Sequence, residues 1–120
     1  MKNPTKFGPN TPEIRQLIKK LKTITPEQAM ELAAAYDTAW NAARSAAYDA
    51  ARDAAWYAAW NAARSAAWNA ARSAAWKAAR PAARSAAYDA TLALLVKDLI
   101  SEDDFNILYG PWAAVMEPTV

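Results

Sequence analysis

A four-residue unit repeats along the chain from Tyr36 to Tyr88. Each unit has two residues that are almost always alanine, then a tryptophan, tyrosine or arginine, and then a small residue that is most often Asp, Asn or Ser. Alanine is the strongest helix former, arginine is a good one, and this stretch contains no glycine. The repeat therefore predicts α-helix and an all-α protein, with little room for a chemical site on loops.

The N-terminal residues predict an irregular segment followed by a short helix. Residues 1–10 contain two prolines and one glycine, which disfavour regular structure. Thr11, followed by Pro and Glu, is a typical N-cap at a helix start. We expect a short basic helix over residues 11–23.

The repeat itself predicts a single long helix. Thr25 and Gln28 have the spacing of a capping box, and no comparable stop signal follows before residue 100. A helix over 26–100 would be about 110 Å long. Pro81 is the one residue inside it that would kink the helix or divide it into two arms.

The C-terminal residues predict a further helical segment over 101–117 in the same single domain. Ser101, followed by three acidic residues, is a helix start. Gly110 and Pro111 are expected to end or turn this helix, so that Trp112 begins a last apolar turn. The aliphatic end of the repeat helix should pack against this segment and against the first helix.

The period of four predicts where the aromatic side chains point. Four residues overshoot a helical turn by about 40°, so the aromatic row spirals around the helix instead of following one face. A break at Pro81, or a solvated helix with stacked Arg and aromatic side chains, would also accommodate the spiral. We favour burial in a homo-oligomer or against a partner protein, with the aromatic residues as the interface: Tyr36, Trp40, Tyr48, Trp56, Trp60, Trp68, Trp76 and Tyr88.

The alternative function is nucleic-acid binding. Arginine neutralises phosphates and tryptophan stacks on bases, and the two alternate within the repeat. The first helix is basic, although the net charge of the whole chain is only +2. The candidate contacts are Lys19, Lys20, Lys22, Arg64 and Arg72.

Enzyme chemistry has little support in this composition. The chain has no His and no Cys, which removes imidazole and thiol catalysis. Asp49 and Asp53 occupy a slot that Asn and Ser otherwise fill, so that slot selects for small polar residues. The acidic residues after Ser101 are explained by helix capping. We expect no catalytic, metal or cofactor site, no membrane segment, and a cytoplasmic protein.

Several pieces of the chain together resemble a group of small alanine-rich proteins from actinobacteria and their phages. The resemblance covers almost the whole chain and rests on Thr-Pro-Glu at 11–13 and 25–27, on the Ala-Ala-Trp/Arg tetrads, and on Gly-Pro-Trp at 110–112. The resemblance implies a phage accessory protein acting in a bacterial host, and it supplies no site residue. A weaker similarity is to Ala-rich immunity proteins, which carry His where this chain has none.

Overall fold

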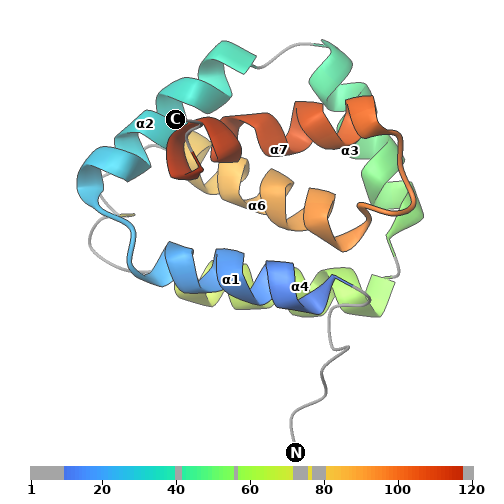
Figure 1. Cartoon of the computed structure of the whole chain (residues 1–120), viewed down its shortest axis with the longest axis horizontal. Coiled ribbons are helices and arrows are strands. Elements are labelled where there is room, and N and C mark those ends of the chain that lie inside the picture. The colour runs from blue at the N-terminus through green and yellow to red at the C-terminus, as the bar shows by residue number, and fades with distance from the viewer. Residues whose placement is uncertain (1–9, 40–41, 56, 72–75, 77–80, 118–120) are drawn as a thin grey trace, which may run out of the picture.

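The computed structural model describes residues 10–39, 42–55, 57–71, 76 and 81–117. The helices in these residues pack into one body with a radius of gyration of 13.4 Å (Figure 1). A globular domain of this length is expected at about 14 Å. The helices are α1 (Thr11–Lys22), α2 (Pro26–Ala39), α3 (Ala42–Ala54), α4 (Tyr57–Ala70), α6 (Pro81–Leu95) and α7 (Glu102–Met116).

The prediction of an all-α protein is confirmed, but that of one long helix over 26–100 is wrong. The described part of the repeat is divided among helices of 13 to 15 residues that run in different directions (Figure 1). Each helix holds about three and a half four-residue units, over which the spiral drifts by about 140°. A longer straight helix would turn its aromatic row into solvent, so burial overrides the helix propensity of alanine.

Two predicted helix starts have the expected hydrogen bonds. The Thr25 hydroxyl accepts from the Gln28 backbone N–H, and the Thr25 N–H donates to the Gln28 side chain, both at 3.1 Å. The Ser101 hydroxyl accepts from the Asp104 N–H at 3.1 Å. The prediction that Thr11 is an N-cap is wrong by one residue, because Asn10 precedes the first helical residue.

The two internal prolines differ from each other. Pro81 is the first residue of α6, where a missing N–H breaks no helical hydrogen bond. Pro111 lies inside α7, which continues through Gly110 to Met116, so the predicted turn there is wrong. Leu108 and Trp112 are fully buried on either side of this proline, and their packing offsets the lost hydrogen bond.

Helix α6 lies at the centre of the body. It packs against α1, α2, α3, α4 and α7 (Figure 1). Its alanines at 83, 86, 87 and 90 are fully buried, and their small side chains permit close helix approach. The predicted packing of this segment on α1 and α7 is confirmed.

Candidate functional site: an aromatic cleft

The predicted interface residues are distributed between the core and the surface of this chain. Trp76 is 1% exposed, and its indole N–H donates to the Leu21 carbonyl oxygen at 2.9 Å. Trp60 is also buried, whereas Trp68 is 54% exposed. Tyr36, Tyr48 and Tyr88 are half-buried. Trp40, Trp56 and Arg72 lie outside the described residues.

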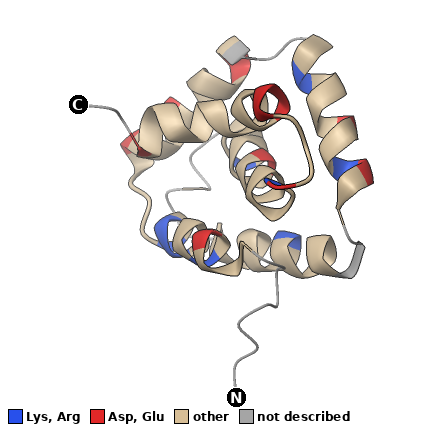
Figure 2. Ribbon diagram, turned by 45° about the vertical axis from the view of Figure 1, so that its right-hand side comes forward, with Lys and Arg blue, Asp and Glu red and all other residues tan. Residues whose placement is uncertain are grey.

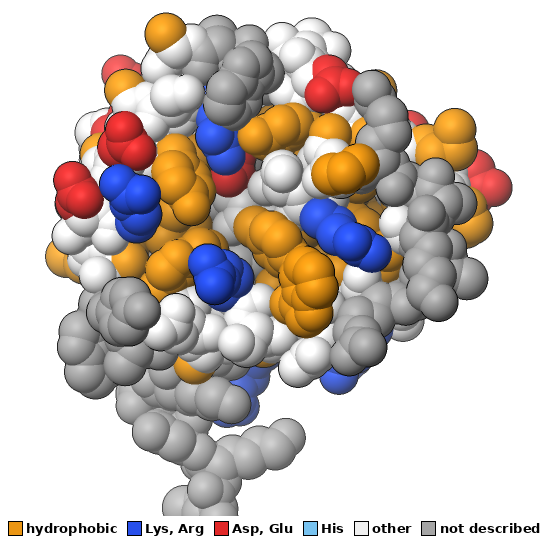
Figure 3. Space-filling view, turned by 180° about the vertical axis from the view of Figure 1, so that it is seen from behind, with side chains coloured by type: hydrophobic (Ala, Val, Ile, Leu, Met, Phe, Trp, Pro, Cys, Tyr) orange, Lys and Arg blue, Asp and Glu red, His pale blue; other side chains and the backbone are white. Residues whose placement is uncertain are grey.

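Helices α3, α4 and α6 enclose a cleft on the back of the molecule as it is drawn in Figure 1. Two adjoining hollows, of about 500 Å³ and about 300 Å³, share Tyr48, Trp60 and Arg64. Figure 3 views the molecule from this side and shows hydrophobic and basic side chains around a depression. Volumes of this size are typical of small-ligand sites.

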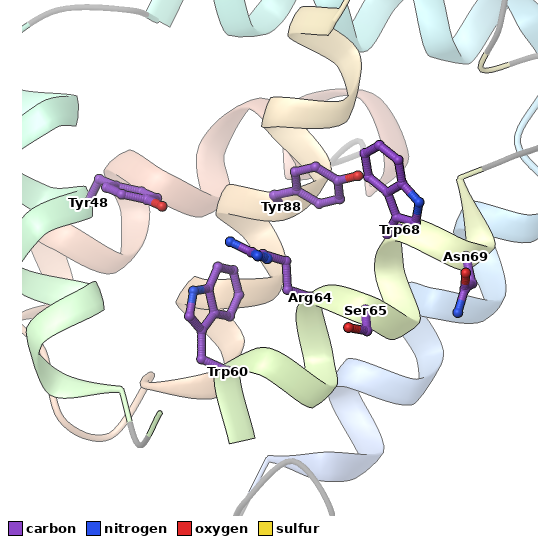
Figure 4. Close-up of a pocket in the computed structure, with 7 residues that line it drawn as sticks. All are labelled: Tyr48, Trp60, Arg64, Ser65, Trp68, Asn69 and Tyr88. Carbon is purple, nitrogen blue, oxygen red and sulfur yellow. The ribbon is translucent and has the colours of Figure 1, made fainter. Parts of the chain in front are cut away.

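Helix α4 supplies one wall of the cleft from three consecutive repeat units. Trp60, Arg64 and Trp68 lie four residues apart and face the cleft together (Figure 4). Tyr48 of α3 points toward them from the opposite side, and Tyr88 comes from α6 (Figure 4). The drift of about 40° per unit spreads the three α4 side chains around the curved wall.

The exposed Trp68 ring lies at the edge of the cleft. Its centroid is 6.4 Å from that of Tyr88, with 24° between the ring planes. The Arg84 guanidinium carbon lies 5.7 Å from the Trp68 centroid, in a cation–π contact. Trp68 therefore presents a preformed aromatic surface next to a positive charge.

The Tyr88 hydroxyl is buried and has no hydrogen-bond partner among the described residues. Burial raises the pKa of this phenol, while the positive charges of Arg84 and Arg64 oppose the increase. Both guanidinium groups therefore act on the same part of the cleft. An unpaired buried hydroxyl is costly, so a ligand that supplied a partner would gain a hydrogen bond there.

A buried ion pair stabilises the position of Tyr48. Arg44 of α3 donates to both carboxylate oxygens of Asp89 on α6, at 2.9 Å and 2.6 Å. The Arg44 guanidinium also lies 4.9 Å from the Tyr48 ring centroid and 5.3 Å from that of Tyr36. Burial raises the pKa of Asp89, and the Arg44 charge opposes that increase.

The charge of the cleft is positive. None of the described lining residues of the two hollows is an Asp or a Glu. Arg52 is paired with Asp49 at 3.7 Å, and both of these side chains are more than half exposed. Arg64 and Arg84 have no carboxylate within ion-pair distance among the described residues.

The predicted lysine contacts are not part of this cleft. Lys19, Lys20 and Lys22 lie on α1, which packs on the far side of α4 from the cleft (Figures 2 and 4). Lys20 also approaches Glu117 at 3.9 Å. Of the predicted nucleic-acid contacts that the structure describes, only Arg64 lines the cleft.

Sequence reasoning missed several residues of this region, among them Arg84, Asp89, Ser65 and Asn69. All four belong to the repeat, and no sequence pattern distinguished them from their neighbours. Asp89 occupies the small polar slot. Its role depends on α3 lying beside α6, which the period alone does not specify.

Comparison with family models, with curated proteins and with solved structures found no match. Within the described residues, no group of three or more acidic side chains is arranged to hold a metal ion. None of the described helices is long and apolar enough to cross a bilayer. The described residues therefore form an all-helical body with an aromatic, arginine-lined cleft.

Proposed function

We propose that this chain is a non-enzymatic binding protein and that the α3–α4–α6 cleft is its binding site. The observation that carries this proposal is Trp68, which is 54% exposed at the edge of a concave site while the other aromatic side chains of that site are buried or half-buried. Exposed aromatic and arginine side chains around a concave surface are typical of binding hot spots.

The chemistry of the lining supports binding rather than catalysis. The described lining residues of the cleft offer phenols, indoles, guanidinium groups, a hydroxyl and amides. None of these has an ordinary pKa near neutrality, as a general base requires. The side chains can stack, donate hydrogen bonds and attract negative charge.

A dye that is itself an aromatic anion tests this proposal without knowledge of the natural partner. We expect 8-anilinonaphthalene-1-sulfonate to bind the folded protein at a single site with an increase in fluorescence. Trp68→Ala and Arg64→Gln should each weaken this binding. Leu99→Ala, which removes a similarly exposed apolar side chain elsewhere, is the matched control and should leave it unchanged.

Failure of the wild-type protein to bind the dye would contradict the proposed site. An equal loss of dye binding in the Leu99→Ala variant would mean that the dye binds exposed apolar surface in general and not the cleft. Near-ultraviolet circular dichroism of each variant verifies that the native packing is retained.

Self-association is the second candidate function. Trp68, Met30 and Leu99 are each more than half exposed, which leaves apolar area for a second copy of the chain. Light scattering distinguishes the two candidates. A mass near 13.1 kDa supports a cleft that serves a foreign partner, and a multiple of that mass that Trp68→Ala reduces supports self-association. The accessory role in a phage remains a prediction from the sequence.

A further inference from the structure

We propose that the ligand of the cleft is a nucleotide unit, with its base on the Trp68 ring and its phosphate at Arg64 and Arg84. This inference rests on the proposed binding function and specifies the chemistry of the ligand. It differs from the sequence prediction in its location, because the lysines of α1 have no part in it.

The aromatic side chains define the planar part of the ligand. Trp68 is one of the most exposed large apolar side chains of the described residues, Tyr48 lies across the cleft from it, and Trp60 is on the same wall (Figure 4). Bases of nucleic acids stack on such rings with little dependence on sequence, because every base has a π face. An aliphatic ligand would gain nothing specific from this arrangement.

The charges define the other part of the ligand. Arg64 and Arg84 both act on Tyr88, and neither has a carboxylate partner among the described residues. A guanidinium presents a planar set of donors that matches phosphate geometry. The two positive charges disfavour a cationic ligand and favour a ligand with at least one negative charge.

The size of the cleft limits the ligand to a short unit. The hollow next to Trp68 has a volume of about 500 Å³, and the adjoining hollow adds about 300 Å³. Small-ligand sites of roughly 300–1,000 Å³ are typical. The base of a double helix has both faces stacked and cannot enter, so the ligand is a free mononucleotide or one unit of a single strand.

The experiment measures binding of a labelled single-stranded DNA of about 12 nucleotides, of the matching duplex, and of AMP and UMP to the full chain. We expect the single strand or a mononucleotide to bind and the duplex to bind at least about tenfold more weakly. If the mononucleotides bind as tightly as the single strand, the natural ligand is a free nucleotide. If only the single strand binds, the ligand is a polymer.

Two pairs of variants test the residues. Trp68→Ala should weaken single-strand binding by about 5- to 150-fold, the range for loss of one stacked base, and Leu99→Ala should leave it unchanged. Arg64→Gln should reduce the slope of log affinity against log salt by about 0.7. Lys22→Gln, an exposed charge on α1, should leave that slope unchanged.

Equal binding of duplex and single strand, or equal effects of Lys22→Gln and Arg64→Gln, would overturn the inference in favour of diffuse electrostatic binding. If the sulfonate dye binds the cleft but no nucleotide or DNA does at low salt, the inference fails and the proposed binding function stands. If neither the dye nor any nucleotide binds, both proposals fail.

Discussion

Removal of the Arg44 guanidinium should strongly destabilise the folded protein. The Arg44 and Asp89 side chains are 14% and 5% exposed, and two short hydrogen bonds join them. Arg44→Met would leave the Asp89 carboxylate buried without a counter-charge, which costs about 3–5 kcal/mol in comparable sites. We expect urea denaturation at pH 7 to show a loss of that size in the free energy of unfolding.

The double variant Arg44→Met with Asp89→Leu separates the cost of the unpaired charge from other effects. Replacing both partners of a buried pair by apolar side chains is often neutral. The double variant should therefore recover at least about 2 kcal/mol relative to Arg44→Met alone. Arg52→Met is the matched control, because the exposed pair of Arg52 with Asp49 should contribute under about 1 kcal/mol.

The dependence on pH provides a further check on the physical cause. In Arg44→Met the folded-state pKa of Asp89, already raised by burial, loses its opposing charge and rises further above the unfolded value of about 3.9. Stability from a raised carboxyl pKa is present below the unfolded value and is lost as pH rises through the folded value. The variant should lose less stability at about pH 4 than at pH 7. An equal loss at both values, or a loss under about 1 kcal/mol, would refute the reasoning.

Three other changes test the fold. Trp76→Phe leaves the Leu21 carbonyl oxygen without its donor and should cost about 1–3 kcal/mol of unfolding free energy in urea, whereas unchanged stability would argue against that hydrogen bond. Ser101→Ala removes the cap of α7 and should cost about 1 kcal/mol, which Ser101→Asp should largely avoid. Burial raises the pKa of Tyr109, and the neighbouring Glu117 carboxylate raises it further. The contribution of this phenol to stability is therefore present below about pH 10, the unfolded-state pKa, and is lost as pH rises through the higher pKa of the folded state. Ultraviolet absorbance should show this phenol ionising above pH 10, the ordinary value of about 10 for tyrosine being too low for it, and ionisation near pH 10 would contradict its burial.

The sequence allowed prediction of helix type and of several helix starts, because those depend on neighbouring residues. The reciprocal hydrogen bonds of Thr25 and Gln28 and the cap at Ser101 follow from local patterns. The ends of α2, α3 and α4 do not, since an alanine-rich repeat without Gly has no local stop signal. These ends are set by burial of the aromatic rows, which depends on the whole fold.

The types of residue in the candidate site could be predicted from the sequence, but the particular residues that line it could not. The aromatic and arginine side chains were identified as the candidates for binding, and Trp60, Arg64 and Trp68 do line the cleft. Two alanines precede Trp76 just as they precede Trp68, yet Trp76 is buried and hydrogen-bonded to Leu21 of α1. The position of a tryptophan within the repeat therefore does not predict its burial.

Nuclear magnetic resonance of the indole N–H groups tests the central claim most directly, namely that the α3–α4–α6 cleft is the binding site. The chain has six tryptophans, and single Trp→Phe variants would assign their signals. During titration with the sulfonate dye, we predict that the signals of Trp60 and Trp68 shift and that those of the buried Trp76 and Trp112 do not. If the Trp68 signal stays unchanged during the titration, the account is contradicted, whether or not the other signals move.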